Sequence, residues 1–118
     1  MNAYPVTVDA LLSALSSTKR RELLAALTRS PMSVSELQKL LGYAMSDISR
    51  HLSELRACGL IISEIHKKEH IQRLARHAHI DLKSGSISIE IDGDEPFHHV
   101  ILKHELHSSA LRSIASAA

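Results

Sequence analysis

The chain of 118 residues has room for one domain with a single hydrophobic core. Its 44% hydrophobic and 23% charged residues exclude a disordered or collagen-like polypeptide, and 3% aromatic residues offer few platforms for stacking single-stranded bases. The formal net charge is only +1, but residues 1–80 sum to +4 and residues 81–118 to −3, which fits either an ordinary solvated surface or a basic face for nucleic acid.

Cysteine usage and the N-terminal sequence indicate the compartment. Cys58 is the only cysteine, which excludes an intramolecular disulfide and a thiolate metal cluster and indicates a reducing cytoplasm. The N-terminus has neither a basic region nor a long apolar stretch, so we expect no signal peptide, no membrane span and a cytoplasmic location. Because Cys58 lacks a partner thiol, we interpret it as a small buried residue and not as a redox switch.

Apolar residues at helical spacing predict two helices before Pro31. They are Val8, Leu11, Leu12 and Leu15 in the first helix and, after the capping cluster Ser16-Ser17-Thr18, Leu23, Leu24 and Leu27 in the second. Since a proline in a helix interior removes a backbone hydrogen bond, the second helix is expected to end at Pro31.

Two further helices are predicted after Pro31. Ser33 and Glu36 form a Ser-x-x-Glu capping box at the start of a short helix, which Gly42 ends. A longer helix is expected from about 45 to 58, with Gly59 as its terminating residue. The apolar stripes of these two helices are Leu37, Leu40 and Leu41, and Ile48, Leu52 and Leu55.

After residue 60 the hydrophobic period changes from helical to alternating, which predicts strands. Apolar residues flank the polar tip Lys67-Lys68 and indicate a β-hairpin; they are Leu60, Ile61, Ile62 and Ile65 before the tip and Ile71 and Leu74 after it. A second hairpin is predicted around a turn at 83–86 and is closed by residues 92–94. Its apolar residues are Ile80, Leu82, Ile87, Ile89 and Ile91.

The C-terminal segment fits two interpretations. Pro96 suits a first helical position, and the residues that fit a helix after it are Phe97, Val100, Ile101, His104, Leu111 and Ile114. The run Val100-Ile101-Leu102 fits a short strand before a shorter helix equally well.

The third and fourth predicted helices, joined by residues 42–44, have the anatomy of a helix-turn-helix. The side of the fourth helix opposite its apolar stripe carries Ser46, Arg50, Ser53 and Ala57. Small residues there let the backbone approach base edges in a major groove, and Arg50 can bind guanine O6 and N7. The hydroxyls of Ser46 and Ser49 can reach phosphates or bases. A plain αα-hairpin fits the periodicity too, but the basic hairpin that follows favours the helix-turn-helix.

The sequence SELQKLLGYAMSDISRHLSELRACGLI, residues 35–61, resembles the helix-turn-helix of ArsR/SmtB-type repressors, most clearly in the runs 49–52 and 55–60. Residues 15–21 resemble the start of the second helix in that family. The resemblance covers roughly the first two thirds of the chain. It implies a homodimer in which the first and last helices form the interface and two recognition helices contact an inverted-repeat operator in double-stranded DNA.

Two departures from the family pattern affect these expectations. The tip Lys67-Lys68 lacks the usual glycine, which puts its turn type in doubt, but it remains basic and able to contact phosphates. The predicted hairpin at 79–91 is not part of the usual pattern and delays the last helix, so we expect it to alter the dimer interface or the effector pocket.

Nine histidines raise the question of metal sensing, which is common in the resembled family. The thiolate pair of its arsenic, lead or cadmium sensors would fall near residues 34–36, where no cysteine stands. The last-helix ligand set of its zinc sensors is matched only in part, with His98, His104 and His107 as weak candidates. We interpret the C-terminal histidines as a polar helix face or as hydrogen-bonding groups at an interface, and we predict no metal and no other cofactor. The effector stays unknown.

We therefore predict an α+β, mainly helical fold: a winged helix-turn-helix with an additional β-hairpin and a C-terminal dimerisation helix. One domain spans residues 1–118. Its parts are the helix-turn-helix at about 33–59, the wing at about 60–76, the extra hairpin at about 78–92 and the C-terminal segment at 96–118.

The predicted function is a sequence-specific, double-stranded DNA-binding transcriptional regulator, expected to be a homodimeric repressor. No Gly-rich phosphate loop, nucleophile with a base or paired carboxylates point to an enzyme. The alternative is a winged-helix protein-protein interaction module without sequence-specific DNA binding, which the modest net charge and the acidic stretch 92–95 keep open. The predicted DNA-binding residues are Tyr43, Met45, Ser46, Asp47, Ser49, Arg50, His51, Ser53, Arg56, Lys67 and Lys68.

Overall fold

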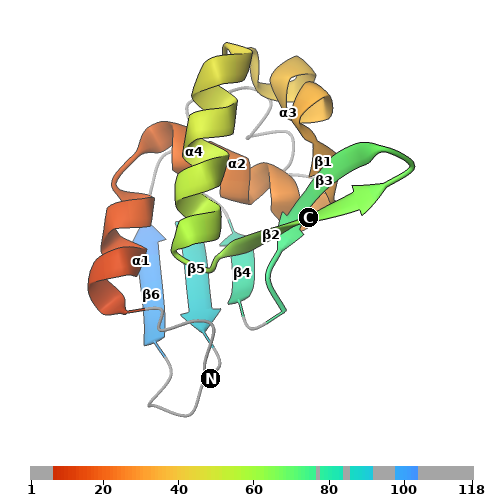
Figure 1. Cartoon of the computed structure of the whole chain (residues 1–118). Coiled ribbons are helices and arrows are strands. Elements are labelled where there is room, and N and C mark those ends of the chain that lie inside the picture. Colours follow the sequence, from red (N-terminus) through yellow and green to blue (C-terminus); the bar gives the residue numbers. More distant parts are fainter. Residues whose placement is uncertain (1–6, 77, 84–85, 92–97, 104–118) are drawn as a thin grey trace.

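The computed structural model describes residues 7–76, 78–83, 86–91 and 98–103. Its elements are α1 (Val8–Leu15), α2 (Thr18–Arg29), β1 (Met32–Ser33), α3 (Val34–Leu41), α4 (Met45–Ala57), β2 (Ile61–His66), β3 (Glu69–Leu74), β4 (Ala78–Lys83), β5 (Ser86–Ile91) and β6 (His98–Lys103). Figure 1 shows β2 and β3 as an arm that projects to one side of the helices. Within these described ranges, no helix is both long enough and apolar enough to cross a membrane.

The predicted capping residues define the helix boundaries around the turn. Ser33 Oγ accepts from the Glu36 N–H at 3.1 Å, and Glu36 Oε1 accepts from the Ser33 N–H at 3.0 Å, which confirms the capping box. Gly42 has φ +78°, and Gly59, which follows α4, has φ +83°; both are left-handed conformations that favour glycine. Residues 42–44 therefore form the short turn between α3 and α4 that the sequence predicts.

The core is aliphatic and lies between the helices and the bases of both sheets. The predicted stripe residues with at most 3% exposure are Leu11, Leu15, Leu23, Leu24, Leu27, Leu37, Ile48, Leu52 and Leu55. Ile61 of β2 and Ile89 of β5 belong to the same cluster, so burial of apolar surface joins helices and sheets into one unit. Leu12 is an exception, because 49% of it is exposed on α1.

The first sheet has the strand order β1-β3-β2 and contains the predicted wing. β2 and β3 pair antiparallel from Ile61 with Leu74 out to His66 with Glu69, which confirms the first hairpin. The two-residue strand β1 was not predicted, because two residues are too few to show an alternating pattern. It pairs with the other edge of β3 and fixes the base of the wing to the start of α3.

The second sheet has the order β4-β5-β6 and confirms the extra hairpin, which is part of a larger unit than predicted. The prediction of a helix over residues 98–103 is wrong, and the alternative prediction of a strand is confirmed. β6 pairs antiparallel with β5, from His98 opposite Ile91 to Lys103 opposite Ser86. An apolar run that includes a β-branched pair satisfies its backbone groups well against an open strand edge. The predicted dimerisation helix over the remaining C-terminal residues lies outside the described ranges.

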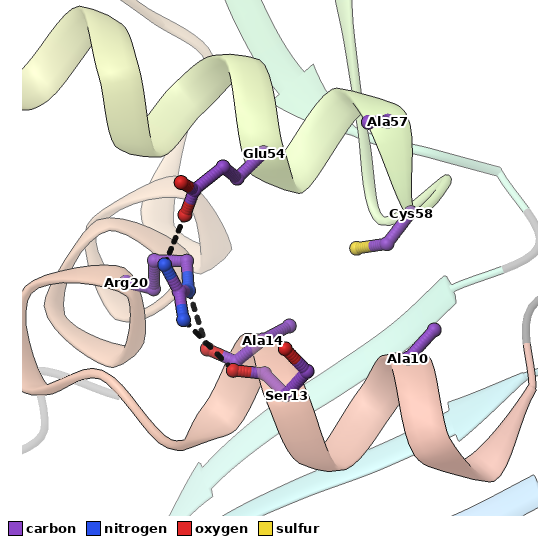
Figure 2. Close-up of a pocket in the computed structure, with 7 residues that line it drawn as sticks. All are labelled: Ala10, Ser13, Ala14, Arg20, Glu54, Ala57 and Cys58. Carbon is purple, nitrogen blue, oxygen red and sulfur yellow. Dashed lines mark hydrogen bonds and ion pairs between the residues drawn. The ribbon is translucent and has the colours of Figure 1, made fainter.

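The mostly buried guanidinium of Arg20, on α2, connects α1 to α4. The Arg20 side chain is 13% exposed and lies between the helices, as Figure 2 shows. Arg20 donates to the carbonyl oxygens of Ser13 at 2.8 Å and Ala14 at 3.1 Å, near the end of α1. It also donates to the Glu54 carboxylate of α4. The Ser13 carbonyl also accepts from the N–H and the hydroxyl of Ser16, so Arg20 adds a further donor at the end of α1.

An open cavity of about 360 Å³ lies beside this contact, lined mainly by small residues of α1 and by the end of α4. Cys58 borders it and is half-buried, and its thiol donates to the Leu55 carbonyl at 3.3 Å. Burial raises the pKa of the Cys58 thiol, which keeps it protonated and poorly nucleophilic at neutral pH. This environment agrees with the interpretation of Cys58 as a structural residue.

Loss of the Arg20 contacts should destabilise the chain. Replacing Arg20 with Met keeps much of the side-chain volume and removes every donor, so we expect a loss of about 2 kcal/mol in the free energy of unfolding. The loss stays below that of a fully buried pair because Glu54 is 48% exposed and can be rehydrated. Urea unfolding measures it, with the exposed Arg29→Met on the same helix as the matched control. Equal losses in both variants would contradict a structural role for Arg20.

Candidate nucleic-acid interface

The outward side of α4 is open to solvent along its length. The exposed residues of this helix include Met45, Ser46, Ser49, Arg50, Ser53 and Ala57. The predicted apolar stripe points the other way, with Ile48, Leu52 and Leu55 at most 1% exposed. The outward side therefore combines three hydroxyls and small side chains with the long cation Arg50, a shape that fits a major groove, and Arg56 of the same helix is exposed as well.

Arg50 is the cation on this face, and an acidic neighbour orients it. The Arg50 side chain is 60% exposed, and its Nη2 donates to Asp47 Oδ1 at 3.1 Å. The other Asp47 oxygen accepts from Lys19 Nζ of α2 at 2.5 Å. Hydrogen bonds from Lys19 and Arg50 hold the pKa of Asp47 below its ordinary value, so Asp47 stays charged at neutral pH. Asp47 is one of the predicted DNA-binding residues, but both of its carboxylate oxygens accept hydrogen bonds within the protein, where they orient Arg50.

Tyr43, in the turn before α4, faces the protein interior. Its hydroxyl donates to the Glu22 carboxylate of α2, and Lys19 Nζ lies 4.8 Å from the centre of its ring. Burial and the hydrogen bond to Glu22 raise the pKa of Tyr43 to about 12. Glu22 is itself 3% exposed, so this bond satisfies a buried carboxylate. Tyr43 fixes the turn to α2, and its hydroxyl is engaged within the protein.

His51 does not share the outward face, which corrects its place among the predicted contact residues. It is 7% exposed, and its Nδ1 lies 3.3 Å from Arg20 Nη1. Because a guanidinium only donates, Nδ1 accepts in this contact. Burial lowers the pKa of His51, which favours the neutral ring that such an acceptor needs. From the sequence, His51 flanks the buried stripe of its helix and either packs or touches a phosphate; its partner Arg20 was not predicted.

The wing tip is a two-residue turn made of lysines. Lys67 has φ +50° and Lys68 has φ +71°, and the strands pair directly on either side, His66 with Glu69. Two consecutive positive φ values are the mark of a type I′ hairpin turn, which usually takes Asn-Gly. This resolves the turn type that the missing glycine put in doubt. Both lysines are exposed at the end of the arm.

Arg56, the remaining predicted contact residue, connects α4 to the wing. Its Nη1 donates to Oε1 of Gln72 in β3 at 2.9 Å, and Gln72 Nε2 donates to Ser63 Oγ of β2 at 3.0 Å. Gln72 is only 2% exposed. Sequence reasoning did not single out Gln72, Lys19 or Glu22, because each is an ordinary polar residue until the folded chain brings its partner close.

Metal ligands do not gather in the part of the chain that the structure describes. No group of three or more His, Cys, Asp or Glu side chains there could hold an ion. Of the weak candidates, His98 begins β6, and His104 and His107 lie outside the described ranges.

Comparisons of the sequence and of the fold with known proteins point to one family. The family model for bacterial regulatory proteins of the arsR family matches residues 17–63, which run from the N-cap of α2 into β2. Among solved structures, HlyU from Vibrio cholerae N16961 shares 30% sequence identity, with a TM-score of 0.54 over 57% of this chain and 73% of that chain. The crystal structure of an ArsR family transcriptional regulator shares 28% identity, with a TM-score of 0.53 over 64% and 78% of the two chains. No curated protein matches the chain.

These similarities agree with the element order of the structure: helices, a short turn, an exposed recognition helix and a basic two-stranded wing. The family match spans the turn and the whole of α4, which are the parts that carry the exposed polar face. The chain belongs to the ArsR family of bacterial regulatory proteins and is a DNA-binding transcriptional regulator built on a winged helix-turn-helix.

Proposed function

We propose that the chain is a sequence-specific repressor that binds an inverted-repeat operator as a homodimer. The observation that carries the sequence-specific part is the open outward side of α4, with Arg50 extended from it beside exposed serines. Arginine contacts guanine through two parallel hydrogen bonds, and the serines are small enough to let the helix enter the groove. Base contacts of this kind specify a sequence, while phosphate contacts position the protein.

The wing supplies the phosphate contacts in this proposal. Its tip consists of two exposed lysines at the end of the arm that projects from the helices in Figure 1. Each neutralised phosphate releases condensed counterions, so these lysines contribute affinity without sequence preference. With α4 in a major groove, the tip would reach the neighbouring minor groove or the backbone beside it.

Homodimerisation is proposed because one α4 contacts only a few base pairs, and a two-fold dimer doubles the contacts on a two-fold operator. Leu12 on α1 is half-exposed, and burial of this apolar side chain against a second protomer supports a dimer interface on that helix. Repression then needs only occupancy, because a bound dimer keeps other proteins off the same duplex.

Selection of bound duplexes from a random library tests the whole proposal. We expect enrichment of an inverted repeat whose half-sites lie about 10 to 10.5 base pairs apart, or a multiple of that spacing. Sequencing of the enriched pool gives the result, and repeating the selection with zinc, nickel or a chelator tests for a metal effector. No duplex affinity even at low salt would contradict the proposal and favour a protein-interaction module.

Arg50→Ala should reduce discrimination more than general affinity. We expect a loss of about 1 to 3 kcal/mol on the selected sequence and a much smaller loss on random duplex, because the guanine contact exists only on the former. Gel-shift titrations on both duplexes measure the difference, with the exposed Arg76→Ala as a control of equal charge change. Equal losses on both duplexes would remove the base-contacting role of Arg50.

Lys68→Gly at the wing tip should stabilise the fold and at the same time weaken duplex binding. Glycine relieves the cost of a left-handed residue, about 1 to 2 kcal/mol, at the expense of a more flexible unfolded chain, so we expect a net gain of about 0.5 to 1 kcal/mol. Affinity for every duplex should fall, and the salt slope should decrease by about one. Lys68→Ala should weaken binding equally without stabilising the fold. Equal stability of the two variants would contradict strain at this turn.

A further inference from the structure

A cleft of about 390 Å³ lies between α4 and the wing. Its polar lining consists of Ser49 and Arg56 from α4 and Ser63, His70 and Gln72 from the wing. Every one of these side chains can donate a hydrogen bond, and none of the lining residues is a carboxylate. The chemistry of this wing cleft therefore suits an anion.

The two faces of the wing differ in charge. Side chains alternate along a strand, and the register pairs Ser63 with Gln72, so both face the cleft together with His70, two residues before Gln72. Glu64 and Glu69, the acidic residues of the two strands, occupy the alternate positions and project from the opposite face. Negative charge is thus kept on the side of the wing that faces away from α4.

Arg56 is held at the cleft without losing its charge to an acidic partner. Arg50 and Arg20 are each paired with a carboxylate, whereas in the described ranges no carboxylate pairs with Arg56. The buried amide of Gln72 takes one of its five N–H donors. A neutral amide fixes the direction of the guanidinium and leaves the remaining donors and the full charge available for a ligand.

We propose that the wing cleft binds one phosphodiester of the DNA backbone, with Arg56, Ser49 and His70 as the donors and Gln72 as the residue that positions Arg56. This inference rests on the proposed function, because it requires α4 and the wing tip to contact the same duplex. The strand that separates the major groove at α4 from the groove reached by the tip then passes over the cleft. Ile65, which lies across from His70 and is 72% exposed, offers an apolar contact to the adjoining deoxyribose.

The salt dependence of duplex binding tests the charge contribution. We expect Arg56→Gln to lower the slope of log affinity against log salt, between about 50 and 200 mM, by about one per protomer. Arg56→Lys should retain the slope but bind more weakly, because an ammonium lacks the paired donors of a guanidinium. The exposed Arg76→Gln is the matched control and should change the slope much less. Thermal unfolding of each variant verifies that it is folded.

Methylphosphonate interference locates the contact on the DNA and can be run on the unmodified protein. Duplexes that carry one neutral methylphosphonate at successive backbone positions should reveal one sensitive position between those affected by Lys67→Ala or Lys68→Ala and the bases affected by Arg50→Ala. Arg56→Gln should be insensitive to that substitution and remain sensitive to the others, which a double-mutant cycle between protein and DNA quantifies. Unchanged sensitivity of Arg56→Gln at every position would overturn the inference.

Gln72→Met tests the positioning role. The Gln72→Met variant should lose most of the duplex affinity that Arg56→Gln loses. The double variant should bind duplex no more weakly than Arg56→Gln alone. A further loss in the double variant would overturn the positioning role, because Gln72 would then act independently of Arg56. If the unmodified protein binds duplex and Arg50→Ala loses discrimination while Arg56→Gln keeps its slope, only the cleft inference fails. If the unmodified protein binds no duplex, both proposals fail.

Discussion

A mostly buried cation, Arg20, helps to orient the recognition helix. Packing of leucines and isoleucines holds α4 against the core, but apolar contacts are non-directional and tolerate rotation of a helix. The hydrogen bonds of Arg20 are directional, and they connect carbonyl groups near the end of α1 to Glu54 of α4. His51 accepts a further contact from the same guanidinium. Because His51 is held inward, the serines and Arg50 are left on the outside of the helix.

Carboxylates near the DNA-facing surface are neutralised or directed away from it. Asp47 would repel phosphate if it stood alone, but Lys19 and Arg50 share its two oxygens. The same contacts limit the directions that Arg50 can take, which would reduce the entropy lost in the base contact proposed for it. In the wing, Arg73 pairs with Glu64 on the face opposite the cleft. A chain with a net charge of only +1 thus presents a locally cationic surface, because its charges are sorted by position.

The sheet of β4, β5 and β6 distinguishes this chain from the pattern that its sequence resembles. Ala78 and Ile89 are buried in the common core, so the sheet is joined to the helices and is not an appended hairpin. Residues 98–103 pair with β5 as the edge strand of this sheet and do not belong to a helical dimer interface in that form. The expectation that this insertion alters the assembly of the protein stays a prediction.

The sequence by itself determined every element whose cause is local. Helix periodicity, the Ser33 and Glu36 capping box, the left-handed Gly42 and the alternation around Lys67-Lys68 depend on residues a few positions apart, so pattern and spacing were sufficient. The tertiary structure alone decided the contacts between distant residues: the inward turn of His51 toward Arg20, the pairing of β6, and the link from Arg56 to Gln72. A polar side chain on an amphipathic element can face solvent or a buried partner with the same local sequence. The choice is made only when folding brings that partner within hydrogen-bond distance.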